Sequence, residues 1–378
     1  MNQWIQTVQG QLPHLSKPQA RILAVWSYVM VVIRSSGINS GAAMIAKLTQ
    51  AKYTNVRQRL REWCWDETDK AGKQRAEVLV ADCFVPLLRW ILAWWDPSVH
   101  RLALALDATT LGDRFVVLAL SVLYRGCAIP IAWKVFAFDR QSEWKPHWLA
   151  LLAHFEQRIP ADWLVIVLAD RGLYADWLFA AIQKLGWHPF LRINGNGKYR
   201  AEGSSQFLPL SQLADRVGCA WTGRVTCFKN KPVQATLLVA WGDGYRDPWL
   251  ILTDLQPHQA QIAWYSLRAW IECGFKHTKR AGWQWQATHM TDPHRAERHW
   301  LVMAVATLWA VSMADIPDPQ LPASSLDPLP PAVPPARKRS QPRLFSCFRL
   351  GCFTILAYLL SHAPLPRGSF RPGPDAFY

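Results

Sequence analysis

The chain has 378 residues, of which 51% are hydrophobic and 18% are charged, so most of it should fold around sizeable cores. Its 42 lysines and arginines outnumber its 27 aspartates and glutamates, which gives a formal net charge of +15. That excess suggests a polyanionic partner, either nucleic acid or an anionic membrane surface. The length and the 22 tryptophans exclude a small ribosomal type of basic protein.

Targeting and redox signals point to the cytoplasm. Residues 1–19 show no basic head followed by an apolar run, so we expect no secretory signal. The most apolar windows, 114–135 and 348–362, are interrupted by charges or are too short to span a bilayer. The eight cysteines are scattered, without a CxxC pair or zinc spacing. We therefore expect a cytoplasmic protein with reduced thiols, no membrane partner and a nucleic-acid substrate.

Residues 1–95 are predicted to form an α-helical N-terminal domain, because apolar residues recur there at helical spacing. The segments with this spacing are 21–33, 41–49, 55–63 and 76–95. The third segment follows a plausible cap, Thr54. It carries three arginines, Arg57, Arg59 and Arg61. A basic helix in a small bundle could lie on DNA, and an ordinary exposed helix explains the same residues equally well.

Residues 96–312 change to short apolar runs separated by turns, which predict strands. The expected order is strands at 102–106, 115–122 and 128–135, a helix at 146–158, a strand at 164–168, a helix at 175–185 and a strand at 189–193. This order implies an α/β domain with a mixed sheet. Residues 194–247 interrupt it with a glycine-rich loop and two strand-like runs, which predict an antiparallel β insertion. A strand at 249–253 and helices at 264–279 and 293–312 complete the domain.

The remainder of the chain differs in composition. Residues 313–343 are rich in proline and carry a basic cluster near residue 338, so an extended linker is expected there. A short apolar helix at about 344–362 and a tail that is rich in proline and glycine should occupy residues 344–378.

The helix predicted after the last strand places several polar side chains on one face. At about 100° per residue, the following fall within roughly 60° of one another: Tyr265, Arg268, Glu272, Lys276 and Lys279. A solvated charged face would explain such a pattern. However, one carboxylate lies among three cations, and an arginine four residues before a glutamate is the poorer order for an intrahelical ion pair.

Two aspartates directly follow apolar strands, Asp107 after residues 102–106 and Asp170 after residues 164–168. Each alone is explained by the capping of a turn or helix. If the first strand is central and the fourth lies beside it, the two carboxylates come side by side. They would then repel each other unless a divalent cation lies between them. Ligands that are all oxygen favour Mg²⁺ or Mn²⁺ over zinc.

Glu272 is the candidate for a third carboxylate on a helix against the same sheet edge. Three carboxylates can hold two metal ions, which activate a water or hydroxyl on one side of a phosphate and stabilise the leaving oxygen on the other. The cations on the same helix are suited to binding the neighbouring phosphates.

These residues resemble the DDE transposases of the insertion-sequence-4 family, which carry an RNase H-like catalytic domain. The family signature near the third acidic residue is Tyr, two residues, Arg, three residues, Glu, six residues and Lys. Tyr265, Arg268, Glu272 and Lys279 have these spacings. The first and second acidic blocks resemble residues 107–109 and 170–174, and the family also has a β-rich insertion before the glutamate. The similarity covers about residues 100–312.

The resemblance implies a role for each residue of the motif. The ligands of two divalent ions, Mg²⁺ or Mn²⁺, would be Asp107, Asp170 and Glu272. The residues that hold phosphates near the transposon end would be Tyr265, Arg268 and Lys279. Lys276 shares their face but lies outside the motif. Family members also trap a flipped base with a tryptophan from the insertion, for which Trp221 and Trp241 are the candidates.

The implied function is cut-and-paste transposition, in which metal-dependent hydrolysis at the element ends precedes attack of the freed 3′-hydroxyl on target DNA. The N-terminal helices would recognise the terminal inverted repeats, and the C-terminal helix would contribute to a homodimer. Two alternatives remain open, an RNase H-like nuclease without strand transfer and a catalytically inactive or domesticated DNA-binding protein.

Overall fold

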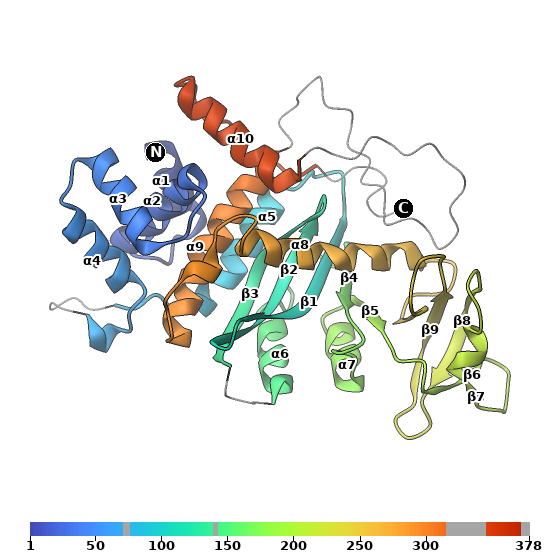
Figure 1. The fold of residues 1–378 in the computed structure, drawn as a ribbon. Coiled ribbons are helices and arrows are strands. Elements are labelled where there is room, and N and C mark those ends of the chain that lie inside the picture. The colour runs from blue at the N-terminus through green and yellow to red at the C-terminus, as the bar shows by residue number, and fades with distance from the viewer. Residues whose placement is uncertain (71–75, 139–142, 315–344, 372–378) are drawn as a thin grey trace.

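The computed structural model describes residues 1–70, 76–138, 143–314 and 345–371. Most of the expected linker at 313–343 and the end of the tail lie outside the described residues. A large sheet forms the centre of the molecule (Figure 1). Helices from the first part of the chain lie at one end of it, and the expected insertion lies at the other.

The described strands form one mixed sheet in which most neighbours are antiparallel. In sheet order they are β3 (Cys127–Ala137), β2 (Phe115–Tyr124), β1 (Arg101–Leu111), β4 (Leu164–Ala169), β5 (His188–Arg192), β10 (Trp249–Thr253), β9 (Val233–Ala240), β8 (Ala220–Cys227), β6 (Lys198–Ala201) and β7 (Leu208–Pro209). The β1–β4 and β4–β5 pairs are parallel. The fourth strand thus lies beside the first, which is the condition under which Asp107 and Asp170 were expected to lie side by side.

The strands at the centre of the sheet are apolar because both faces are covered. β2 is buried along almost its whole length, as expected for a strand with no solvated face. It returns into β3 through a two-residue turn, Arg125-Gly126, in which both residues have positive φ. A turn of this kind matches the twist of the flanking strands, and glycine adopts the required backbone without strain.

Alternate residues of β1 and β4 face opposite sides of the sheet. Ala103, Ala105, Ile166 and Leu168 belong to a small core cluster beneath the 3₁₀ helix η4 (Ile262–Arg268) and the helix α8 (Ala269–Thr278). The residues between them join the main core on the other face, which α6 (Trp144–Ala153) and α7 (Asp176–Lys184) help to cover. In Figure 1, α8 crosses the sheet on the side away from α6 and α7.

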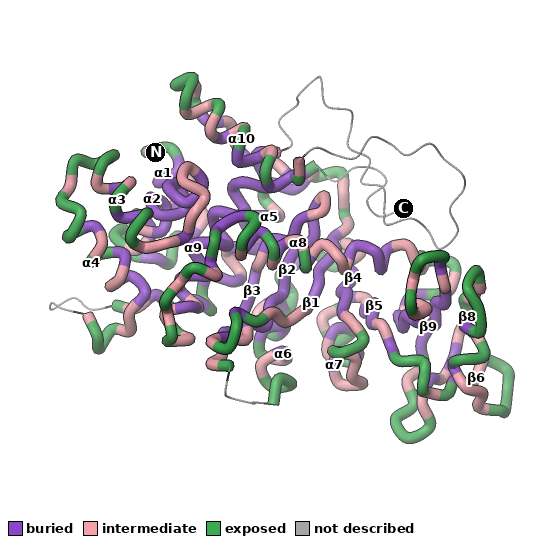
Figure 2. Tube along the Cα trace, in the orientation of Figure 1, coloured by how far each residue is buried: buried purple, intermediate pink, exposed green. Residues whose placement is uncertain are grey.

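The remaining helices surround the end of the sheet near β3. They are α1 (Asn2–Gln11), α2 (Lys17–Ile33), α3 (Ile38–Thr49), α4 (Tyr53–Trp63), α5 (Phe84–Trp94), α9 (Pro293–Ser312) and α10 (Cys347–Leu360). Their core is continuous with that of the sheet (Figure 2). Trp4 of α1 stacks on Trp309 of α9 at 4.2 Å between ring centroids, and Trp26 of α2 stacks on His299 at 5.1 Å.

Two expected helices begin later than the sequence predicted. The helix expected from residue 76 is replaced at its start by an irregular segment and a 3₁₀ turn, and α5 begins only at Phe84. Pro86 lies in the first turn of α5, where its missing N–H costs no intrahelical hydrogen bond. The single helix expected over 264–279 is also wrong, because its first part is the 3₁₀ helix η4. Three residues per turn place Trp264 and Leu267 on the same side, against the sheet.

The described part of the C-terminal region is bound into the fold. α10 begins after Ser346, whose hydroxyl accepts a hydrogen bond from the backbone of Arg349, and packs beside α9. The chain then returns to the end of α5, where the backbone of Phe370 pairs with Trp95. The ring of Phe370 is fully buried. Leu365 and Phe370 thus anchor residues 363–371 to the core, while Pro364, Arg367 and Arg371 remain exposed.

No single described helix is long and apolar enough to cross a membrane. One pair, α2 and α3, meets the criterion jointly, but the two helices are bent by 101° at the break between them.

Candidate active site

The pairing of β1 with β4 places two aspartates side by side. The parallel register matches Leu106 with Ala169, so the next residues on the two strands are Asp107 and Asp170. Asp170 follows the end of β4, as predicted. Asp107 lies within β1, which continues to Leu111, so its predicted place at the end of a strand is wrong. The strand is longer because the residues after Asp107 pair with β2.

The alternation along both strands turns these aspartates toward α8. Ala103 and Ala105 face η4 and α8, and Asp107 follows them with the same parity. In β4, Ile166 and Leu168 face the same way. The two carboxylates therefore project from the sheet face that carries η4 and α8, where the remaining charged residues of the motif lie.

Arg268 connects these carboxylates with that of Glu272. Its Nη2 donates a hydrogen bond to Oδ2 of Asp107 at 2.8 Å and lies 3.6 Å from Oδ2 of Asp170. Its Nη1 donates to Oε1 of Glu272, one helical turn later. The three carboxylates thus come from β1, the end of β4 and α8, and they meet at a single guanidinium group. The sequence predicted their convergence but did not predict the arginine between them.

Burial differs strongly among the four side chains. Arg268 and Asp107 are 15% and 18% exposed, whereas Asp170 is 37% and Glu272 is 51% exposed. Burial raises the pKa of Asp107 despite the neighbouring guanidinium. Burial alone would lower the pKa of Arg268, but the carboxylates of Asp107 and Asp170 outweigh it and raise that pKa. Arg268 and Asp107 therefore form a largely buried ion pair, in which the carboxylate of Asp107 helps to stabilise the charged guanidinium of Arg268.

The donor set of this cluster fits a divalent cation of the Mg²⁺ type. All its side-chain donors are carboxylate oxygens, which this class of ion prefers. Nε of Arg268 is buried without a hydrogen-bond partner among the described residues, so the guanidinium is incompletely satisfied where it lies. Within the described ranges, no group of three or more His, Cys, Asp or Glu has the geometry of a metal site. The carboxylates are arranged around Arg268 instead.

Tyr265 lies away from the exposed face on which it was expected. Its side chain is 4% exposed, and its hydroxyl donates to the backbone carbonyl of Ala169 at 3.4 Å. Its ring packs edge-on against Trp249 of β10 at 5.2 Å. Because Tyr265 is in a 3₁₀ helix, the angular positions of an α-helix do not apply to it. In this structure it supports the end of β4 from which Asp170 projects.

Lys279 and Lys276 differ in their surroundings. Lys279 follows the last residue of α8, and its Nζ donates to the hydroxyl of Thr109 at 2.8 Å. Burial lowers the pKa of Lys279. Thr109 is two residues after Asp107 and therefore shares its face of β1, a spacing that could have indicated its place in the site. Lys276 is exposed on α8.

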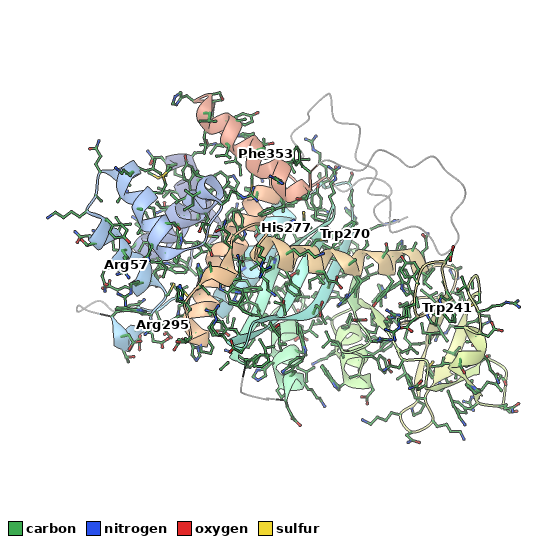
Figure 3. The ribbon with its side chains drawn as sticks, viewed as in Figure 1. Arg57, Trp241, Trp270, His277, Arg295 and Phe353 are labelled. Carbon is green, nitrogen blue, oxygen red and sulfur yellow. The ribbon has the colours of Figure 1, made fainter. Side chains whose placement is uncertain are left out.

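The three arginines of α4 do not form one exposed row. Arg57 donates to the side chain of Asn39 at 2.8 Å, and the guanidinium of Arg61 lies 5.3 Å from the ring of Trp65. Arg59 is exposed. Figure 3 shows Arg57 among the N-terminal helices, at the opposite end of the molecule from Trp241.

The loop between β9 and β10, residues 241–248, contacts the strand end beside the site. Asp247 forms an ion pair with Arg171, the residue after Asp170, at 3.0 Å. The indole N–H of Trp241 donates to the backbone of Tyr245 in this loop at 2.9 Å. Trp221 instead packs near Tyr199 within the insertion, with 6.0 Å between ring centroids. Both tryptophans are partly exposed.

The residues of this site lie within the range matched by one protein family. The family model for the transposase DDE domain matches residues 105–309, which is more than half of the chain and includes all three carboxylates. Among the curated proteins compared, none matches the chain. The match and its extent show that the protein belongs to the DDE transposases, enzymes that act on DNA.

Proposed function

We propose that this protein is a transposase of the insertion-sequence-4 family, with an RNase H-like catalytic domain, that moves an insertion element by cut-and-paste transposition. It would hydrolyse the phosphodiester at the terminal inverted repeats and join the freed 3′-hydroxyls to target DNA. One observation carries the proposal. Carboxylates from β1, the end of β4 and α8 converge at one point, although residues 107 and 272 are far apart in the sequence.

DDE transposase domains generally use divalent metal ions. In the proposal, Asp107, Asp170 and Glu272 hold two such ions, Mg²⁺ or Mn²⁺. The ions supply an activated water or hydroxyl and neutralise the charge that develops on the leaving oxygen. Asp107 is mostly buried and Glu272 is half exposed. This difference supports two kinds of metal ligand, a fixed one on the sheet and a solvent-accessible one on the helix.

The chain's cations would orient the DNA. Lys279 is held at the edge of the site by Thr109, which keeps its ammonium within reach of a phosphate beside the scissile bond. Lys276 adds exposed positive charge on the same helix. Arg268 is proposed to bind phosphate once it leaves the carboxylates. Tyr265 is assigned an indirect role, because its hydroxyl is directed at the backbone of Ala169.

The wider organisation is part of the same proposal. Residues 1–95 form the DNA-binding domain, in which Arg59 is the exposed arginine of α4. Residues 96–312 form the catalytic domain with the insertion at 194–247, followed by the linker and the C-terminal helix. The active form is a homodimer in the cytoplasm, which brings two element ends together. A partly exposed tryptophan of the insertion, Trp221 or Trp241, would receive a flipped base.

Metal-dependent cleavage tests the proposal. The substrate is duplex DNA with the sequences that flank this gene, supplied with Mg²⁺ or Mn²⁺. Glu272→Gln keeps the shape of the side chain and removes its charge. Asp113→Asn is the matched control, because it removes a carboxylate from the exposed turn after β1 without touching the site. We expect the wild type and the control to cut at defined ends. The cleavage rate of Glu272→Gln should be lower by a factor on the order of 100 or more, which is the usual contribution of a single catalytic group.

The products decide among the candidate functions. Cutting followed by joining to a second DNA supports transposition. Cutting by the wild type without joining indicates a nuclease. DNA binding by both proteins with no cutting at any metal concentration refutes the enzymatic proposal and leaves a DNA-binding protein.

A further inference from the structure

A tight turn follows the helix that carries Glu272. The segment 279–285, named here the Lys279 turn, folds back on the end of α8. The backbone N–H of Trp283 donates to the carbonyl of His277 at 2.8 Å, and that of Gln284 donates to the carbonyl of Lys279 at 2.8 Å. Gly282 is required at this place, because a Cβ there would collide with the carbonyl oxygen of His277. The turn fixes the direction in which Lys279 leaves the helix.

Phe348 of the C-terminal helix α10 closes this turn from outside. Its ring stacks on the ring of His277, with 4.4 Å between centroids and 12° between planes. The indole of Trp283 meets the same ring edge-on at 4.9 Å. Phe348 is 1% exposed and His277 is 7% exposed, so the contact is dry. Figure 3 shows His277 on α8 near the base of α10.

The segment between α2 and α3 contacts the other side of the Lys279 turn. The guanidinium of Arg34, directly after α2, lies 5.3 Å from the centre of the Phe348 ring and donates to the carbonyl of Ala281 at 3.1 Å. The backbone N–H of Ser36 donates to the carbonyl of Trp283 at 2.7 Å. The Lys279 turn is therefore held from two sides, by the ring of Phe348 and by hydrogen bonds from the segment after α2.

We propose that Phe348 is a positioning residue for Lys279, so that the C-terminal helix completes the DNA-binding edge of the active site. Phe348 holds the ring of His277, this fixes the Lys279 turn, and the turn directs the ammonium of Lys279 to Thr109. The inference rests on the proposed function, since it takes Lys279 to bind a DNA phosphate. It adds that this phosphate contact depends on a helix outside the 105–309 match to the transposase domain.

The salt dependence of DNA binding measures the contact. Each phosphate contact contributes a slope of about 0.9 to the plot of log affinity against log salt concentration. The probe is a fluorescently labelled duplex with the sequence that flanks this gene, titrated with full-length protein without divalent ions. We expect Lys279→Met and Phe348→Ala each to lower the slope by about 0.9. The double variant should show no further decrease, because both changes remove the same contact.

Phe353→Ala is the matched control. It removes the same kind of side chain from the same helix, but Phe353 is 41% exposed. It lies farther along α10 from His277 (Figure 3), and its ring contacts that of Phe345 at 5.2 Å between centroids. Its slope should equal that of wild type. If Phe348→Ala does not fold, as judged by thermal unfolding, Phe348→Leu replaces it. Leucine fills most of the same volume but offers no flat ring to His277, so the slope should again decrease.

The outcomes separate this inference from the proposed function. A folded Phe348 variant with the wild-type slope, or a double variant whose loss is the sum of the single losses, overturns the positioning role. A wild-type slope in Lys279→Met contradicts the phosphate contact itself and with it the inference. A decrease in Lys279→Met but not in the Phe348 variants refutes the inference alone and leaves the proposed function standing.

Discussion

Arg268 holds the three carboxylates together, and replacing it should have opposite effects on protein stability and on metal affinity. Arg268→Met keeps an apolar stem in place and removes the guanidinium. Asp107, which is 18% exposed in the wild type, then loses its cationic partner. Removing one member of a buried ion pair typically costs about 3–5 kcal/mol. Asp170 and Glu272 are more exposed and add less, so we expect a loss of about 3 kcal/mol in unfolding free energy without divalent ions.

The same substitution should strengthen metal binding. In the proposed metal site, a divalent ion would have to displace the guanidinium of Arg268 from the carboxylates of the wild type before it could bind all three. If that contact is worth about 3 kcal/mol, its removal should tighten Mn²⁺ binding on the order of 100-fold, because each 1.4 kcal/mol is a factor of about ten. The variant is therefore expected to be less stable without metal and to recover stability at much lower Mn²⁺ concentration.

Thermal unfolding during a Mn²⁺ titration, without DNA, measures both effects. Arg171→Met is the control, because Arg171 is adjacent to Asp170 in sequence but is half exposed and pairs with Asp247. It removes one positive charge near the site without leaving a buried carboxylate unpaired. The reasoning is refuted if Arg268→Met responds to Mn²⁺ at the wild-type concentration, or if Arg171→Met shows the same tightening.

Two further outcomes follow from burial. Burial lowers the pKa of both His277 and His299 to about 4, so stability that is present above pH 6.5 should be lost as the pH falls from 6.5 toward 4. His299→Gln should roughly halve this decrease in unfolding free energy, measured by urea unfolding at several pH values. If the pH dependence of the variant equals that of the wild type, the decrease does not come from the buried histidines. A Cβ at Gly274 would lie 2.7 Å from that of Ala128, so Gly274→Ala should destabilise by about 1–3 kcal/mol despite better helix propensity. Adding Ala128→Gly should recover part of the loss, and a Gly274→Ala variant as stable as wild type would refute the packing account.

The elements nearest the site were the most predictable from the sequence. Apolar runs that end at Asp107 and Asp170 were enough to predict β1 and β4 as strands, because a sheet buried on both faces leaves a strong pattern. Their adjacency was only a condition in the sequence argument, and the parallel pairing of the two strands meets it. The position of Glu272 on a helix against this sheet also followed from the spacing of its motif. These predictions depended on residues close together in the sequence, or on segments whose apolar pattern identified them clearly as strands.

Other features depend on contacts that no local pattern contains. The place of Arg268 between the carboxylates requires the mutual position of β1, β4 and α8, and spacing along one helix gives only its face. Tyr265 was misplaced because its segment is a buried 3₁₀ helix rather than the exposed turn of an α-helix. The contact of Phe348 with His277 joins residues on opposite sides of the proline-rich segment, and nothing in either sequence neighbourhood predicts it.

The insertion shares its backbone ladder with the strand that leads to Asp170. β8 pairs with β9, β9 with β10, β10 with β5 and β5 with β4, so hydrogen bonds run without a break from the tip of the insertion to the carboxylates. A hinged flap could close on DNA while leaving the site unchanged. In a continuous sheet, a displacement of one strand is passed to its hydrogen-bonded neighbours, and here that series of neighbours leads from the insertion to β4 and β1. If the insertion holds a DNA end as proposed, the position of that DNA is therefore coupled to the strands that carry Asp107 and Asp170.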